Sequence, residues 1–167
     1  MGGQTEMDKL NAQSAEKVQK HLENLGFDCQ VVEFSSSTRT AADAAQAIGC
    51  EVAQIAKSLI FRTANTNRPI LIITSGINRV DENLLATRLG ELIIKADADF
   101  IRQHTGFVIG GVPPVGHMQP IETYIDEDLL LFEEIWAAAG TPHAVFKLKP
   151  TDLLQMTGGM VINVIEG

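Results

Sequence analysis

Ser58-Leu59-Ile60-Phe61-Arg62 and Pro69-Ile70-Leu71-Ile72-Ile73-Thr74 are two apolar segments separated by one short polar stretch. That stretch ends in Ala64-Asn65-Thr66-Asn67-Arg68, which is rich in the polar residues that favour turns. Short runs rich in isoleucine and bounded by turn residues are typical of buried strands. We therefore predict a β-hairpin, whose two strands are antiparallel neighbours. A wholly parallel sheet would need helical crossovers between strands, so this segment favours a mixed sheet.

Helix and strand patterns alternate on both sides of this hairpin. Apolar spacing and terminal glycines predict helices over residues 7–25, 41–48, 81–89, 97–104 and 150–157, with Thr38 or Thr40 as the N-cap of the second. Further strands are predicted at 30–34, 92–95, 121–125, 134–138, 144–148 and 161–164, with a second hairpin across Gly140-Thr141-Pro142. The prediction is a single domain of the α/β (mixed α+β) class, with a central curved mixed β-sheet flanked by helices. It covers residues 9–167, after a flexible N-terminal lead at 1–8.

Composition and charge exclude several classes of protein. The 167 residues are 45% hydrophobic and 20% charged, which is typical of a folded globular domain. No apolar run approaches the roughly 20 residues needed to span a bilayer, so we expect no membrane contact. A net charge of −8 argues against a protein that coats nucleic acid, and we expect no DNA partner. Contact with a few phosphates at one end of an RNA remains open.

The cysteines and histidines do not form a metal-binding pattern. Cys29 and Cys50 are the two cysteines, and they lack CxxC spacing. The four histidines also lack ligand spacing, so we expect neither a metal nor a cofactor. Free thiols and the lack of a secretory signal pattern favour a reducing, cytoplasmic location.

The segment Gly110-Gly111-Val112-Pro113-Pro114-Val115-Gly116-His117 is a candidate functional loop. Glycine allows a ligand to approach the backbone closely, while proline fixes φ and removes an N–H donor. Such a loop contributes little apolar burial, and loops of this kind often carry a site. An ordinary structural turn is the alternative, and the loop alone does not decide between the two.

Lys57 is a second candidate, because it is a lone charge in Gln54-Ile55-Ala56-Lys57-Ser58-Leu59. An unpaired buried ammonium is costly, so this residue must reach solvent, find a partner or take part in chemistry. One interpretation is a strand-edge lysine whose head is in water. The other is a fixed cation at the mouth of a pocket, where it holds a phosphate, hydroxyl or carbonyl oxygen.

Together these motifs resemble the YbaK-type aminoacyl-tRNA deacylases, free-standing relatives of the editing insertion domain of bacterial prolyl-tRNA synthetase. The resemblance runs from about residue 18 to residue 164 and includes Ser37-Thr38-Arg39-Thr40, the Gln54–Leu59 segment and the 110–116 loop. It implies a mixed α/β fold and hydrolysis of an amino acid wrongly esterified to tRNA. The implied partner is the acceptor end of a mischarged tRNA, with a synthetase as an open second partner.

The resemblance also implies site residues. Lys57 occupies the position of the family's required lysine, and the family's GxxxP loop maps onto Gly110 through Pro114. We therefore expect Lys57, Gly110 and Gly111 to be catalytic. The expected substrate-binding residues are Thr38, Arg39, Thr40, Ser75, Val112, Pro113, Pro114 and His143.

The chemistry of ester hydrolysis suits these residues. Negative charge develops on the carbonyl oxygen, and the bare N–H groups of Gly110 and Gly111 would stabilise it. Lys57 would position the terminal adenosine. Pro113 stands where the family commonly has Ser or Thr, which leaves the choice of amino acid open. Two other classes also remain open: a noncatalytic module that binds tRNA or a synthetase, and a small-molecule-binding domain.

Overall fold

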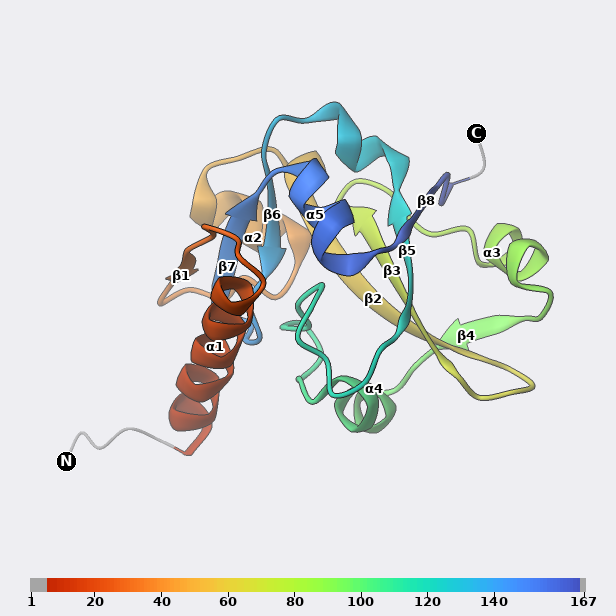
Figure 1. Cartoon of the computed structure of the whole chain (residues 1–167), viewed down its shortest axis with the longest axis horizontal. Coiled ribbons are helices and arrows are strands. Elements are labelled where there is room, and N and C mark those ends of the chain that lie inside the picture. The colour runs from red at the N-terminus through yellow and green to blue at the C-terminus, as the bar shows by residue number, and fades with distance from the viewer. Residues whose placement is uncertain (1–5, 166–167) are drawn as a thin grey trace.

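Residues 6–165 are the part of the chain that the computed structural model describes, and there the chain forms one eight-stranded mixed sheet (Figure 1). The strand order is β1-β7-β6-β2-β3-β5-β8, and β4 pairs with β2 outside this row. The strands are β1 (Val31–Glu33), β2 (Ile55–Thr63), β3 (Pro69–Ser75), β4 (Ile93–Lys95), β5 (Glu122–Asp126), β6 (Ile135–Ala138), β7 (Ala144–Leu148) and β8 (Met160–Ile162). The two hairpins, β2–β3 and β6–β7, are antiparallel, whereas β2–β6, β3–β5 and β5–β8 are parallel. The predicted mixed sheet is confirmed.

The helices lie where the sequence predicts them, within one or two residues. They are α1 (Glu6–Asn24), α2 (Ala41–Ile48), α3 (Glu82–Leu89), α4 (Ala98–Thr105) and α5 (Pro150–Thr157), with short 3-10 turns η1 (Val52–Gln54) and η2 (Glu127–Leu131). Of the two N-cap candidates for α2, the cap is Thr40, whose hydroxyl accepts a hydrogen bond from the Asp43 amide at 3.0 Å. No helix within the described ranges is both long and apolar enough to cross a membrane.

The N-terminal boundary differs from the prediction. Residues 1–5 of the predicted lead lie outside the described residues, whereas residues 6–8 form the first turn of α1. Because α1 packs Val18 and Leu22 against the sheet, its buried face stabilises the helix from its C-terminal half.

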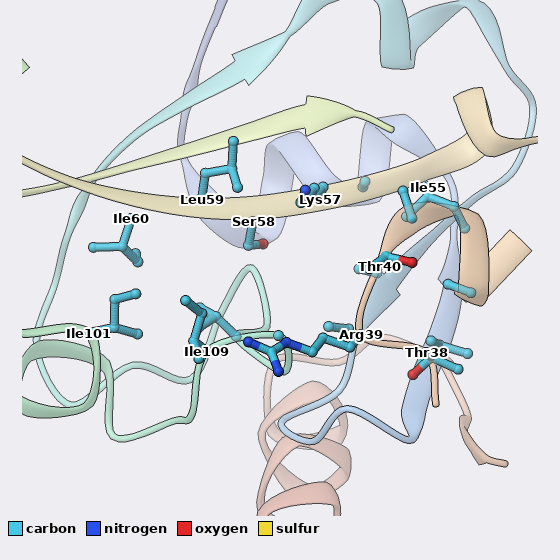
Figure 2. Close-up of a pocket in the computed structure, with 18 of the residues that line it drawn as sticks. Thr38, Arg39, Thr40, Ile55, Lys57, Ser58, Leu59, Ile60, Ile101 and Ile109 are labelled. Atoms are coloured by element: carbon cyan, nitrogen blue, oxygen red, sulfur yellow. The ribbon is translucent and has the colours of Figure 1, made fainter. Parts of the chain in front are cut away.

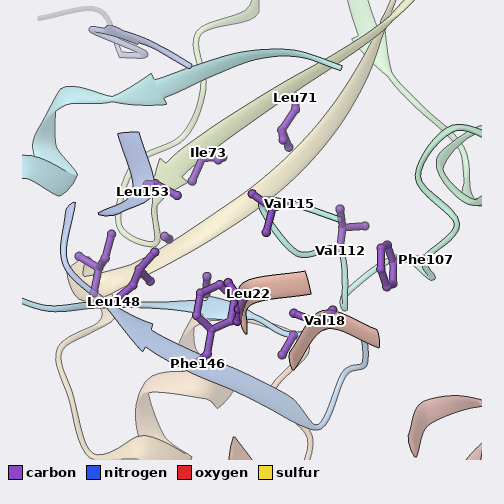
Figure 3. Close-up of a cluster of buried hydrophobic side chains, with 14 of the residues drawn as sticks. Val18, Leu22, Leu71, Ile73, Phe107, Val112, Val115, Phe146, Leu148 and Leu153 are labelled. Atoms are coloured by element: carbon purple, nitrogen blue, oxygen red, sulfur yellow. The ribbon is translucent and has the colours of Figure 1, made fainter. Parts of the chain in front are cut away.

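Apolar side chains along β3 point alternately to the two faces of the sheet, which explains why helices cover both faces. Leu71 and Ile73 belong to the larger core cluster, which also contains Leu22 of α1 and Leu153 of α5 (Figure 3). Ile101 of α4 belongs to the same cluster. The neighbouring β3 residues Ile70 and Ile72 point to the other face and pack with Leu85 of α3. Because β3 is buried on both faces, its sequence is a continuous apolar run and does not alternate between apolar and polar residues.

The two edges of β2 differ, and this difference positions the site. Along one edge, β2 pairs with β3 from Ala56 to Arg62. Along the other, β6 pairs with Ile55 and Ala56, and β4 pairs with residues 61–63. Among the described strands, residues 57–60 therefore have no partner on that edge, which leaves a gap in the sheet between β6 and β4.

Candidate functional site

A cavity of about 310 Å³ lies at this gap in the sheet (Figure 2). Its walls come from β2, from the start of α2, from the segment around Ala96, from the 109–112 loop and from β6. This volume is at the lower end of the range of roughly 300–1,000 Å³ for small-molecule sites. The lining residues are Thr38, Arg39, Thr40, Ala41, Ala44, Ile55, Ala56, Lys57, Ser58, Leu59, Ile60, Phe61, Lys95, Ala96, Ile101, Ile109, Gly110, Val112, Trp136, Ala137, Ala138 and Val145.

All the charged residues that line this cavity are cations. They are Arg39, Lys57 and Lys95, and within residues 6–165 the lining includes no carboxylate. Among the described residues, the ion pairs of the chain involve other lysines and arginines and leave these three without an acidic partner. In a chain with a net charge of −8, such a cluster makes the charge around this cavity locally positive.

Lys57 is exposed and lies at the start of the unpaired segment of β2. The register places it opposite Thr74 of β3. Strand geometry fixes its backbone, because β2 is held by β3 on one side and by β6 just before Lys57 on the other. Lys57 is therefore held on a rigid element that lines the cavity, which favours a positioning role.

The 108–111 segment is a tight turn in which Gly110 is required. The Gly111 amide donates to the Val108 carbonyl at 3.1 Å, and Gly110 has φ +87°. This is the third position of a type II turn, which needs a positive φ. A Cβ at Gly110 would also lie 2.6 Å from Cγ of Arg39, so the loop and the arginine stem pack directly together.

Gly111 lies outside the lining, and its amide is already used by the turn. A Cβ at Gly111 would lie 2.7 Å from backbone atoms of Thr141, in the loop between β6 and β7. The residue thus allows two backbones to approach closely. The expectation that Gly111 supplies an N–H to the ester does not fit this geometry. Gly110 and Val112 line the cavity instead, and no hydrogen bond involves their amides within residues 6–165.

Pro113 and Pro114 are buried behind the cavity and do not line it. The Pro113 carbonyl accepts a hydrogen bond from Nε2 of His117 at 2.7 Å, which fixes the end of the loop. Burial lowers the pKa of His117, and the bond to Pro113 opposes this shift. The neutral imidazole therefore serves as a structural donor to the loop.

Two further predicted residues also lie away from the cavity. Ser75 is buried, and its hydroxyl donates to the Ala53 carbonyl at 2.8 Å. His143 contacts the Ser36 carbonyl through Nδ1 at 3.0 Å and so connects two loops. Of the eleven predicted residues, the cavity thus brings together Thr38, Arg39, Thr40, Lys57, Gly110 and Val112, and it leaves out Gly111, Ser75, Pro113, Pro114 and His143.

The structure adds lining residues that sequence reasoning missed. Lys95 and Ser58 bring polar groups, and Ile109 and Trp136 bring apolar surface. Ser58 directly follows Lys57 on the unpaired segment, which was an available signal. No sequence signal identifies Trp136 as a lining residue. Its position at the cavity depends on the parallel pairing of β6 with β2, and these strands are about 80 residues apart in the chain. Within the described part of the chain, no cluster of three His, Cys, Asp or Glu side chains could hold a metal.

Comparison with known proteins gives a consistent result. Residues 35–156, which include Lys57 and the glycine/proline loop, match the model of the aminoacyl-tRNA editing domain family. The chain is 30% identical over 144 residues to "Uncharacterized protein YwhH" of Bacillus subtilis, covering 86% of this chain and 91% of that protein. It is 24% identical over 164 residues to "Putative Cys-tRNA(Pro)/Cys-tRNA(Cys) deacylase EbsC" of Enterococcus faecalis, covering 95% and 98%. A solved structure described as "Crystal structure of a putative trans-editing enzyme for prolyl tRNA synthetase" is 48% identical, with a TM-score of 0.86 and coverage of 92% and 98%.

Proposed function

Because the chain belongs to the aminoacyl-tRNA editing domain family, we propose that it is a hydrolase that cleaves the ester bond of a mischarged aminoacyl-tRNA. The observation that carries this proposal is the cavity in the gap of β2. The charged residues that line it in the described part of the chain are all cations, and its lining includes both Lys57 and Gly110. The 3′ end of a charged tRNA has the matching chemistry: phosphate, ribose hydroxyls, a flat base and an ester.

The cations and the apolar walls would bind the terminal nucleotide. Lys57 and Arg39 would hold phosphate or ribose oxygens, and Arg39 is already fixed by its packing on Gly110. The exposed side chain of Ile109 and the half-buried ring of Trp136 offer surfaces for the base. Binding in this way would place the ester inside the cavity, next to the turn.

Hydrolysis would then need a water molecule and a donor for the developing oxyanion. Water attacks the carbonyl carbon, the bond from that carbon to the ribose oxygen breaks, and a proton passes to the ribose oxygen. The amides of Gly110 and Val112 are the backbone donors at the cavity for the carbonyl oxygen. We assign the orientation of the water to the neighbouring ribose hydroxyl of the substrate, because the described residues that line the cavity include no carboxylate or histidine to act as a base.

The proposed partner is the acceptor end of a tRNA, with a synthetase as an optional second partner, and the proposed place of action is the cytoplasm. A broad basic face is not needed, because one end of the RNA enters one cavity. This reconciles an RNA substrate with the acidic composition of the chain.

The test is release of labelled amino acid from tRNAs charged with alanine, serine, threonine, cysteine or proline. The proposal predicts that the purified protein releases at least one of these amino acids, and that Lys57→Ala does not. A protein that binds these tRNAs and releases no amino acid is a binding module, and the proposal is then wrong. A protein that neither binds nor cleaves them points to a small-molecule role for the cavity.

A further inference from the structure

The hydroxyl of Ser58 is the buried side-chain polar atom that lacks a hydrogen-bond partner within residues 6–165. Buried hydroxyls in folded proteins almost always have a partner, because leaving one unpaired costs the desolvation of the group without the gain of a hydrogen bond. Ser58 also lines the cavity. An unpaired group in this position indicates that its partner comes from a ligand.

The backbone of Ser58 faces the same gap. The Ile60 carbonyl accepts from the Ala96 amide on the β4 side, whereas the Ile55 carbonyl accepts from Gly76 on the β3 side. Alternate residues of an antiparallel strand bond to opposite edges, so Ser58 directs its N–H and C=O toward the open edge. Both its side chain and its main chain are thus available to a bound molecule.

The surroundings of the hydroxyl are apolar. Ala56, Ser58 and Ile60 share one face of β2, and Ala56 and Ile60 belong to the larger core cluster with Ile101 and Val112. Figure 2 shows the Ser58 side chain pointing from β2 across the cavity, toward the wall that carries Arg39 and Ile109. The hydroxyl is therefore a single polar group on an apolar wall.

We propose that Ser58 is a specificity-determining residue, whose hydroxyl pairs with a hydroxyl on the side chain of the esterified amino acid. The substrate class is then a small hydroxyl-bearing amino acid, serine or threonine, on the 3′ end of tRNA. This inference rests on the proposed function. A substrate hydroxyl can both donate to and accept from Ser58, whereas the methyl of an alanyl group would leave Ser58 unpaired in an apolar wall.

Specificity is measured as the ratio of the kcat/KM values for two aminoacyl esters, because one rate alone does not report selectivity. One tRNA is charged with serine, threonine, alanine or cysteine, and kcat/KM for deacylation is measured with wild type and Ser58→Ala. The wild type is expected to favour seryl over alanyl ester by about tenfold or more. Ser58→Ala is expected to lower the seryl rate about tenfold and to keep the alanyl rate within about twofold. The exposed Ser35→Ala is the matched control and should leave both rates unchanged.

A binding measurement on the wild type removes any dependence on the folding of a variant. The probes are adenosines that carry a seryl or alanyl group at the 3′ position through a stable amide, titrated calorimetrically. The seryl probe should bind about tenfold more tightly. Equal affinity for the two probes, or equal loss of both esterase rates in Ser58→Ala, overturns the role of Ser58 and leaves the proposed function intact. If wild type releases none of these four amino acids but releases proline, the role of Ser58 is overturned alone; if it releases none of the five, the proposed function itself fails.

Discussion

The two edges of β2 differ in whether the polar groups beside them have hydrogen-bond or ion-pair partners. On the β3 side, the carboxylate of Asp126 is fully buried and accepts four hydrogen bonds, from Thr74, Ser75, Asn78 and Asp128, at 2.8–3.0 Å. On the open side, the described residues leave three cations without an acidic partner and one buried hydroxyl without a hydrogen bond. A satisfied polar group stabilises the fold, whereas an unsatisfied one on a cavity wall is available to a ligand.

Removing the cation at the open edge should have the largest effect. Lys57→Ala is expected to lower deacylation by about 100-fold or more, because the ester would lose a group that positions it. Its thermal unfolding should match that of wild type, since the side chain is exposed and has no acidic partner among residues 6–165. Lys20→Ala, which removes an exposed cation of α1, is the control and should keep full activity. Equal activity of the two variants would contradict the assignment.

On the β3 side of β2, where the polar groups have partners, we expect a substitution to lower stability rather than activity. Asp126→Ala leaves the hydroxyl of Thr74 and the amides of Ser75 and Asp128 without their acceptor. We expect a loss of about 3 kcal/mol or more in the free energy of unfolding, measured by urea denaturation. The folded fraction should still deacylate tRNA. Asp99→Ala, at an exposed position of α4, should cost less than about 1 kcal/mol, and a similar cost for both variants would remove the distinction between the edges.

Arg39 tests whether the second cation acts in binding. Arg39→Ala should raise KM about tenfold with a smaller change in kcat, because the guanidinium is placed to hold the nucleotide rather than the ester. Its activity should also depend less steeply on salt than that of wild type. Arg39→Lys keeps the positive charge, and its KM should lie between that of wild type and that of Arg39→Ala. A fall in kcat with an unchanged KM would move Arg39 from binding to the chemical step.

How far the sequence predicts this arrangement depends on the range of the contacts. The helix ends and the two hairpins follow from local signals such as Thr40, Gly49 and the 64–68 turn, and the structure matches them. The gap in β2 does not follow, because it results from β6 and β4 stopping short of each other on the same edge. The local sequence pattern predicts where strands lie, but it does not predict which strands pair with each other in a mixed sheet.

The same reason explains which site residues sequence reasoning found. Lys57 stands out as a charge in an apolar run, and the structure places it at the cavity. Gly110 and Gly111 look alike in sequence, yet one lines the cavity and the other packs on Thr141. In sequence, Ser58 is marked only by its place directly after Lys57. It becomes significant only because its hydroxyl is buried at the open edge without a partner in the described chain.

The smallest effect concerns the loop behind the cavity. Burial holds the pKa of His117 below its ordinary value of 6.5, so the unfolded chain binds the additional proton first as the pH falls. Stability from this group is therefore present above that value and is lost as the pH falls below it. His117→Gln should lose less stability than wild type between about pH 7 and about pH 5. Thermal unfolding at the two pH values measures the difference, and identical losses would show that His117 does not contribute.

The proposed function requires the open edge of β2 to bind the aminoacylated end of tRNA. A crystal structure with a stable 3′-aminoacylamido adenosine tests it most directly. We expect the adenosine to lie between Lys57 and the Gly110 turn, with the acyl group against β2. The analogue seated elsewhere, for example in the groove of α1 beside Lys17 and Gly116, with the β2 cavity empty, would contradict it.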